Sequence, residues 1–269
     1  KKVFFWVVFK LFIHVILICL AFWNLPSTHS GSKSMFGAMN ALLFIFVMQT
    51  PANHRLFLPL LKLGIQDWQG GKYSLNMMST LHCWAQYLLS VILATMTSVL
   101  SYWTVNFNDP ATAMGYSIVL FTMGFVYSAG VWDSIYFLLY ALGCSANMSW
   151  FVMAHLLLYF WLFSGCFILK TSMPFALRVI GYYANPVRLT LESQYCAIIL
   201  PKTFGNERGS DILAESDYDC AIGFDLCLVF LITFILRIVG SFVLAYRYES
   251  IPLYNEHMAM YMNNANDYG

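Results

Sequence analysis

Apolar residues fall into six long stretches, and most polar and charged residues lie in the segments between them. A helix needs about 20 apolar residues to cross a hydrocarbon core roughly 30 Å thick. Backbone groups in lipid must bond within their own segment, which favours helices over the short alternating strands of a barrel. The sequence therefore predicts an all-α integral membrane protein with transmembrane helices at about residues 3–23, 34–50, 81–105, 110–132, 148–169 and 221–246.

The connection between the last two stretches, about residues 170–220, is long and only partly polar. It contains two semi-apolar segments, 175–183 and 187–200. We expect these to be short re-entrant helices, because non-helical backbone at membrane depth requires cover from protein or a wet cavity. The predicted organisation is one membrane domain over residues 1–248, with this loop inside it, and a polar tail over residues 249–269.

Composition agrees with membrane lipid as a partner, since 60% of residues are apolar and 10% are charged. Soluble proteins average roughly 25% charged residues. The net charge of +1 and the lack of a basic stripe argue against nucleic acid as a partner. The first apolar stretch is long for a signal peptide and no small-residue cleavage site follows it, so we interpret it as a retained span. Because the chain begins at Lys1, we expect either a fragment of a longer protein or a processed chain.

The basic residues indicate an orientation. An even number of spans puts both ends of the domain on one side, and basic residues in short loops mark the cytosol. We therefore predict a multi-pass protein of the plasma membrane or an organelle membrane, with cytosolic termini. The basic residues that share this side are Lys1, Lys2, Arg55, Lys62, Lys72 and Arg247.

The sequence offers no catalytic residues and no metal site. A phosphate-binding P-loop requires the pattern GxxxxGK[ST], and the nearest segment, GSKS at residues 31–34, lacks the first glycine. Neither an HExxH zinc motif nor a GxSxG nucleophile motif occurs. We therefore expect a protein that is not an enzyme by itself and that has no cofactor in this chain.

Three groups of residues invite a functional interpretation. Arg237 falls in the last stretch, where a charge near the centre of the membrane costs about 2.5–3.5 kcal/mol. It has either a structural hydrogen-bonding role or a direct contact with substrate. Cys196 and Cys220 share the long loop, where an oxidising compartment would allow a disulfide and a reducing one two free thiols. An aromatic group near the end of the fifth stretch either packs in the core and at the interface or lines a cavity: Tyr159, Phe160 and Phe163.

The order and spacing of five motifs resemble the membrane domain of the G subfamily of ABC transporters, the White and pleiotropic-drug-resistance group of the ABC-2 type. The resemblance extends from the first stretch to Arg247. The motifs that carry it are AFWN at residues 21–24, DWQGGKY at 67–73, FSG at 163–165, NPVR through LE at 185–192 and LRIVG at 236–240.

This resemblance implies a six-helix exporter domain that pairs with a second membrane domain, identical or different. ATP and Mg²⁺ would bind to associated cytosolic ATPase domains, which are further partners. It also implies roles for individual residues. Asp67, Gly71 and Tyr73 would couple the domain to the ATPase; Phe44, Phe46 and Met48 would line the substrate cavity; Cys166 and Phe167 would form the exit plug; and Cys196 with Cys220 would match the family's disulfide.

We therefore expect the membrane domain of an ATP-driven exporter of a hydrophobic or amphipathic compound, such as a lipid, a sterol or a drug-like molecule. The alternative is a membrane scaffold or assembly subunit of a larger complex that transports nothing. An ion-coupled carrier fits less well, because such carriers need a titratable relay and the stretches contain few acids.

Overall fold

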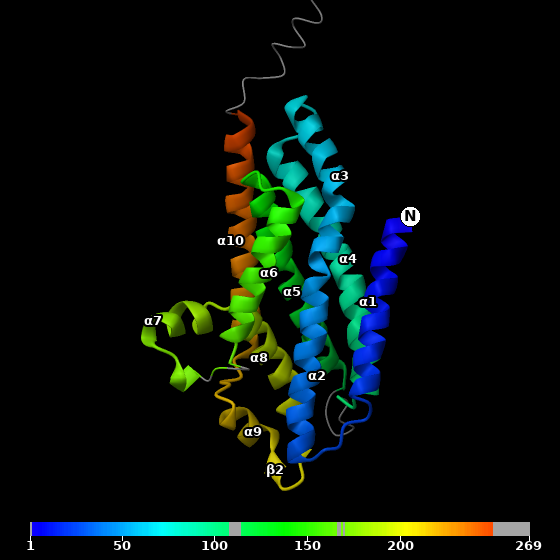
Figure 1. Ribbon diagram of the computed structural model, residues 1–269, viewed down its shortest axis with the longest axis vertical. Coiled ribbons are helices and arrows are strands. Elements are labelled where there is room, and N and C mark those ends of the chain that lie inside the picture. Colours follow the sequence, from blue (N-terminus) through cyan, green and yellow to red (C-terminus); the bar gives the residue numbers. More distant parts are fainter. Residues whose placement is uncertain (1, 108–113, 166–167, 169, 250–269) are drawn as a thin grey trace, which may run out of the picture.

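The computed structural model describes residues 2–107, 114–165, 168 and 170–249. This part of the chain is a helical bundle with one small antiparallel hairpin at its lower end (Figure 1). We call the lower end in Figure 1 the hairpin end and the opposite end the α3 end. The elements are α1 (Lys2–Ala21), α2 (His29–Met48), α3 (Thr50–Gln69), α4 (Leu75–Thr104), α5 (Met114–Ala141), α6 (Ala146–Leu162), η1 (Lys170–Ser172), α7 (Phe175–Leu177), η2 (Arg178–Tyr183), α8 (Pro186–Ile199), β1 (Thr203–Phe204), β2 (Glu207–Arg208), α9 (Gly209–Glu215) and α10 (Ile222–Glu249).

Polar residues just before several helices explain where these helices begin. The side chain of Thr28 accepts a hydrogen bond from Gly31 N at the start of α2, and Ser74 accepts one from Met77 N at the start of α4. Ser145 does the same for α6. Each such cap accepts a hydrogen bond from a backbone N–H that has no partner within the helix, and it stabilises the helix by about 1 kcal/mol.

Five helices are long and apolar enough to cross a membrane: α1, α2, α4, α5 and α10. The shorter apolar helix α6 has 17 residues and lies where the fifth span was predicted. The chain is thus a membrane-embedded helical bundle. Several expected boundaries change. Helix α2 begins at His29 and α4 at Leu75, several residues before the apolar stretches from which they were predicted. Helix α5 continues to Ala141, nine residues past the predicted end, and α6 ends at Leu162, seven residues before it.

The second apolar stretch was predicted to end at Pro51, but the chain continues there as a further helix. Only Gln49 separates α2 from α3, and its backbone angles are helical. A proline in the first turn of a helix is well tolerated, because its missing N–H would have no partner there in any case. Helices α2 and α3 therefore follow one another along the long axis of the bundle (Figure 1).

Helix α3 extends past the apolar run of α1. At the α2–α3 junction the side chain of Gln49 donates to the carbonyl of Val7, at 3.1 Å. Val7 lies only five residues from Lys2, at the polar edge of that run. Because an α-helix rises about 1.5 Å per residue, the 20 residues of α3 cover roughly 30 Å. Most of α3 thus lies beyond the apolar part of α1, at the α3 end.

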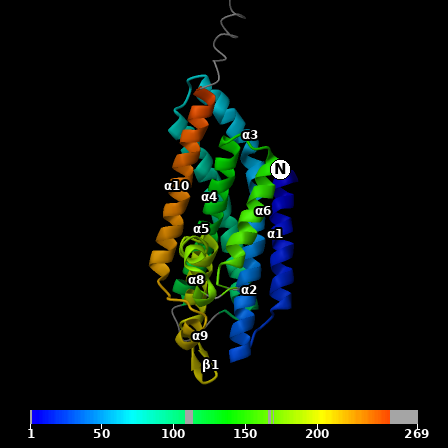
Figure 2. The same ribbon diagram turned by 60° about the vertical axis from the view of Figure 1, so that its left-hand side comes forward.

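Helix α5 is the centre of the bundle. It contacts α2, α3, α4, α6, α8 and α10, and several of its large side chains are completely buried, among them Phe121, Phe125 and Trp132. Its closest neighbour is α10, where Gly240 allows the two backbones to approach: a Cβ on Gly240 would lie 2.8 Å from Cδ1 of Phe137. Both views place α1 and α10 on opposite sides of the bundle (Figure 2).

The segment after α6 contains short helical pieces, of which α8 is deeply placed. All 14 residues of α8 are buried, and the helix packs against α5, α10, α2 and α6. The preceding pieces η1, α7 and η2 instead protrude from the side of the bundle (Figure 1), with Phe175 80% exposed. The polar tail predicted over residues 249–269 lies outside the described residues, except for Glu249.

Replacing Gly240 by leucine should destabilise the protein, since the added side chain would meet buried Phe137 and the backbone of Leu138. Overpacking of this kind costs about 1–3 kcal/mol. We expect the midpoint of thermal unfolding in detergent to fall by several degrees. Gly223→Leu is the matched control on the same helix, because nothing lies within 4 Å of a Cβ there. Equal midpoints for the two variants would contradict the close approach of α5 and α10.

Candidate functional site

A cluster of buried polar side chains joins four helices near the α3 end. Arg237 of α10 donates from Nε to Ser134 Oγ of α5 at 3.1 Å, and its Nη2 donates to the side-chain oxygen of Gln86 on α4. Gln86 Nε2 in turn lies 3.1 Å from His54 Nδ1 of α3. All four side chains are at least nine-tenths buried. We call Arg237, Ser134, Gln86 and His54 the polar cluster.

Two further polar residues adjoin the cluster without bonding to it. The ring of His82 lies 5.8 Å from that of His54, and neither of its nitrogens has a hydrogen-bond partner among the described residues. Asp133 precedes Ser134 on α5, and its Oδ1 likewise has no partner there. Within the described chain Arg237 forms no ion pair with Asp133; its guanidinium bonds to neutral groups and lies 5.0 Å from the centre of the Phe137 ring.

The position of the cluster refines what was expected of Arg237. Sequence counting placed this residue near the centre of the membrane. In the structure Arg237 is joined through Gln86 to His54, which follows Gln49 by only five residues on the α2–α3 arm. Because Gln49 contacts Val7 near the polar edge of α1, the cluster lies toward the α3 end of the apolar run of α1. Within α10, Arg237 lies well inside the apolar run Ile222–Arg247.

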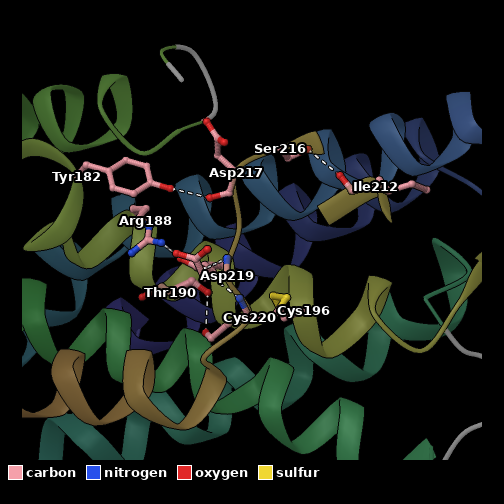
Figure 3. The surroundings of a disulfide bond; sticks show 11 residues. Tyr182, Arg188, Thr190, Cys196, Ile212, Ser216, Asp217, Asp219 and Cys220 are labelled. Carbon is pink, nitrogen blue, oxygen red and sulfur yellow. Dashed lines mark hydrogen bonds and ion pairs between the residues drawn. A yellow bond between two sulfur atoms is a disulfide. The ribbon is translucent and has the colours of Figure 1, made fainter. Parts of the chain in front are cut away.

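A second buried network lies near the hairpin end, around α8 (Figure 3). Arg188 and Glu192, four residues apart on α8, form an ion pair that is almost completely buried. Glu192 Oε1 also accepts hydrogen bonds from the backbone amides of Asp219 and Cys220, at 2.8 and 3.3 Å. Burial raises the pKa of the Glu192 carboxyl, while Arg188 and the two amides lower it. The carboxyl group thereby holds the end of the loop against α8.

The same contact is made covalently by Cys196 and Cys220, which form a disulfide with a Cα–Cα distance of 5.5 Å. Around it, Tyr182 donates from its hydroxyl to the carbonyl of Asp217 at 3.0 Å (Figure 3). Burial raises the pKa of Tyr182 to about 12, so the phenol keeps the proton that this bond requires. Asn185 caps α8 by accepting from the amides of Val187 and Arg188. Loop and helix thus form one compact unit.

The residues expected to line a cavity do not face one space within a single copy of the chain. Phe46 is buried against Phe125 of α5, with ring centres 5.0 Å apart. Phe44 is 42% exposed and packs edge-on against Trp161 of α6 at 5.1 Å. Three others are partly buried, namely Met48, Tyr159 and Phe160, and Phe163 lies beside Tyr159 with ring centres 4.9 Å apart.

The hollows found in the described chain are too small for a lipid or a drug. One is lined by residues of α2, α5 and α6, including Met48 and Trp132, and another lies between α1 and α4. Each has room for about 10 Å³, which is no more than one water molecule. Ligand pockets usually measure about 300–1,000 Å³.

The residues expected to couple to an ATPase lie together at the tip of the α3 end. Asp67 is in the last turn of α3, and its Oδ1 accepts from Lys72 Nζ at 2.8 Å. Gly71 adopts a positive φ of 74°, which turns the chain toward α4, and Tyr73 is 44% exposed. The pair is open to solvent, so it adds little to stability. The expected plug residues Cys166 and Phe167 lie outside the described residues.

The polar cluster was not predicted from the sequence, because its members come from four helices and each residue by itself carries no sign of the others. One signal was present: His82 and Gln86 are spaced by four and so share a face of an otherwise apolar helix.

A comparison with models of known protein families finds no match, and neither does a comparison with curated proteins.

Replacing Gln86 by leucine should destabilise the bundle, because Arg237 Nη2 and His54 Nδ1 would both lose a buried partner. An unpaired buried polar group costs about 1–3 kcal/mol. The measurement is thermal unfolding of the purified protein in detergent, with exposed Gln66→Leu on α3 as control. An unfolding midpoint for Gln86→Leu as high as that of the control would contradict a structural role for the cluster.

Removing the disulfide with the double change Cys196→Ser and Cys220→Ser should also lower stability. A cross-link between residues 24 apart removes freedom from the unfolded chain, which corresponds to about 3 kcal/mol. A reductant should lower the unfolding midpoint of the unmodified protein in the same way and leave the double variant unchanged. Cys227→Ser, an exposed free thiol, serves as control. A reductant effect that persists in the double variant would contradict this assignment.

Proposed function

We propose that this chain is the membrane domain of an ATP-driven exporter that moves a hydrophobic or amphipathic compound. ATP and Mg²⁺ bind to an associated ATPase domain, and the present chain supplies the path through the membrane. The observation that carries the proposal is the arm formed by α2 and α3. It consists of α2, which is long and apolar enough to cross a membrane, and of α3, which extends beyond the apolar run of α1 and ends in the Asp67–Lys72 pair.

The orientation of the arm supports an energy source on the cytosolic side. Lys62, Lys72 and Arg247 all belong to the α3 end, and basic residues in short loops mark the cytosol. ATP is hydrolysed in the cytosol, so a soluble ATPase domain would meet the tip of α3. Helix α6 counts as the sixth span, since 17 residues cover about 25 Å, the lower limit for crossing.

The polar cluster supports a route for mechanical coupling. Force applied to Asp67 acts on α3, and His54 of α3 is joined through Gln86 to Arg237 of α10 and then to Ser134 of α5. Hydrogen bonds between neutral groups and one arginine can exchange partners, and unpaired Asp133 is a neighbouring acceptor on α5. Movement of α3 therefore shifts α4, α5 and α10 relative to one another. The disulfide and the hydrogen bonds from the Asp219 and Cys220 amides to Glu192 keep α8 and the loop before α10 together during this movement.

The path for cargo is formed between two membrane domains. The two hollows described above have room for about one water molecule each, and a chamber between two domains would give the cargo more space. The surface of α2 and α6 suits this role, because exposed Phe44 packs on Trp161 there. Alternating access then admits cargo from the cytosol or the inner leaflet and releases it on the opposite side of the membrane.

A scaffold or assembly subunit is the second candidate function. The small size of the hollows favours it, because a subunit that transports nothing needs no chamber. An exposed arm would then serve only to bind a partner protein. The two functions differ in one respect: only the exporter links the state of the arm to movement of a compound.

Asp67→Arg tests the exporter, because it reverses the charge at the tip while removing only a solvent-exposed pair. In inside-out vesicles we expect ATP-dependent uptake of a lipophilic probe to fall by about tenfold or more, with ATP hydrolysis uncoupled from uptake. Such a loss corresponds to about 1.4 kcal/mol of coupling. Thermal unfolding should be unchanged, since exposed ion pairs contribute about 0–1 kcal/mol.

Glu215→Arg is the matched control, because it makes the same charge change on exposed α9 at the hairpin end. Normal coupled uptake by Asp67→Arg would refute the proposed coupling. If ATP causes no uptake of the probe by the unmodified protein, while the arm still binds a partner protein, the result would favour the scaffold function.

A further inference from the structure

Asp133 of α5 is a buried carboxyl group that takes part in none of the bonds of the polar cluster. Its side chain is 3% exposed, and Oδ1 has no hydrogen-bond partner among the described residues. A buried polar atom without a partner is costly, so it calls for an explanation. The guanidinium group of Arg237 is incompletely satisfied as well, because its Nη1 has no partner in the described part of the chain. One acceptor and one donor are thus left over in the same region.

The packing of α5 against α10 places these two groups close together. Two close contacts fix how the helices lie against each other, namely Gly130 with Thr233 and Phe137 with Gly240. Each pair is seven residues from the other along its helix, so the two helices run side by side in the same direction. Asp133 lies midway between the two contacts on α5, and Arg237 lies midway between them on α10. Their charges are near enough to interact.

In the arrangement that the structure shows, Arg237 is held by other acceptors. Its Nε donates to Ser134 and its Nη2 to Gln86, and both acceptors are neutral. A carboxylate forms a stronger bond to a guanidinium group, but a buried ion pair carries a larger desolvation cost. These two effects oppose each other, so neither acceptor excludes the other. Gln86 is also in contact with His54 of the α2–α3 arm, and the position of the arm therefore affects which acceptor Arg237 can reach.

We propose that Asp133 is the second partner of Arg237, and that the arginine exchanges Gln86 for Asp133 when α3 moves Gln86 away. The inference rests on the proposed function, which assigns the α2–α3 arm to energy coupling, and it names the residue that receives the arginine. In the exchanged state the guanidinium group donates to Oδ1 of Asp133, while Gln86 stays with His54. Helix α10 is then bonded to α5 alone, and α4 is free to move with α3. Asp133 is a positioning residue for this switch.

A double-mutant cycle tests the exchange without ATP. Thermal unfolding of the full chain in detergent is measured for Asp133→Asn, for Gln86→Leu and for the two changes together. Asp133→Asn alone should shift the midpoint by no more than about 2 °C, because Oδ1 has no described partner to lose. In Gln86→Leu the arginine takes its second partner. Adding Asp133→Asn there should lower the midpoint by about 4 °C or more, since a buried donor then loses its acceptor.

Two further variants keep this cycle decisive. If Gln86→Leu does not fold, Ser134→Ala replaces it as the background, because it removes the other acceptor of Arg237 with a smaller change in volume. Asp225→Asn is the matched control. Asp225 is likewise buried and has an unpaired oxygen, Oδ2, but it lies in the first turn of α10, three turns away from Arg237. Its effect on the midpoint should be the same with and without Gln86→Leu.

A measurement of transport separates a switch from a purely structural contact. In inside-out vesicles Asp133→Asn should lower ATP-dependent uptake of a lipophilic probe by about fivefold or more, because one of the two states loses its ion pair. Its unfolding midpoint should stay near that of the unmodified protein. Asp225→Asn should leave uptake unchanged.

Four results would overturn the proposal. The first is an equal effect of Asp133→Asn in the presence and absence of Gln86, and the second is the same dependence on Gln86 in the Asp225→Asn control. The third is a fall of several degrees for Asp133→Asn alone, which would assign the carboxyl group to a permanent contact. The fourth is normal ATP-dependent uptake by Asp133→Asn. If the unmodified protein shows no such uptake, the exporter proposal fails, and the double-mutant cycle still decides whether the arginine changes partner.

Discussion

Polar side chains between the helices must find partners inside the bundle, because lipid offers none. At the α3 end this constraint is met in part around Arg237, whose Nε and Nη2 bond to Ser134 and Gln86, while Gln86 reaches His54. Arg237 Nη1, both ring nitrogens of His82 and Asp133 Oδ1 have no partner among the described residues. One buried arginine thus connects α10, α5, α4 and α3 at a single level. The packing of the apolar side chains is non-directional, so these few directional bonds fix how the four helices are placed relative to one another.

The two ends of the bundle meet the same constraint in different ways. Near the hairpin end, a disulfide and two backbone hydrogen bonds to the Glu192 carboxyl group join α8 to the loop before α10. Glu192 is also paired with Arg188 of the same helix in a buried ion pair. At the α3 end the bonds are between neutral groups and one arginine, and the Asp67–Lys72 pair is exposed. Covalent and buried ionic contacts resist rearrangement, whereas hydrogen bonds beside an unpaired carboxyl group allow it. A rigid end and an adaptable end suit a domain that is moved from one side.

The outward surfaces show which parts of the bundle are built for lipid. On α1, α4 and α10 they are largely apolar, as lipid-facing surfaces should be, although α1 also exposes Lys10. Helix α6 likewise exposes Phe151 and Leu158. The central helix α5 is instead mostly buried between Phe121 and Phe137.

The sequence by itself determined that the chain is embedded in a membrane and roughly where its long apolar helices lie, because exclusion from water is a local property of about 20 consecutive residues. Arg188 and Glu192 are four residues apart, which places them on one helix face, and there they form an ion pair. Only the tertiary structure decided that α3 continues beyond Pro51, that Phe46 is buried while Phe44 is exposed, and which polar groups meet. Gln86 and Arg237 are 151 residues apart. Such contacts depend on which face each helix turns toward its neighbours, and that choice is made by the packing of the whole bundle.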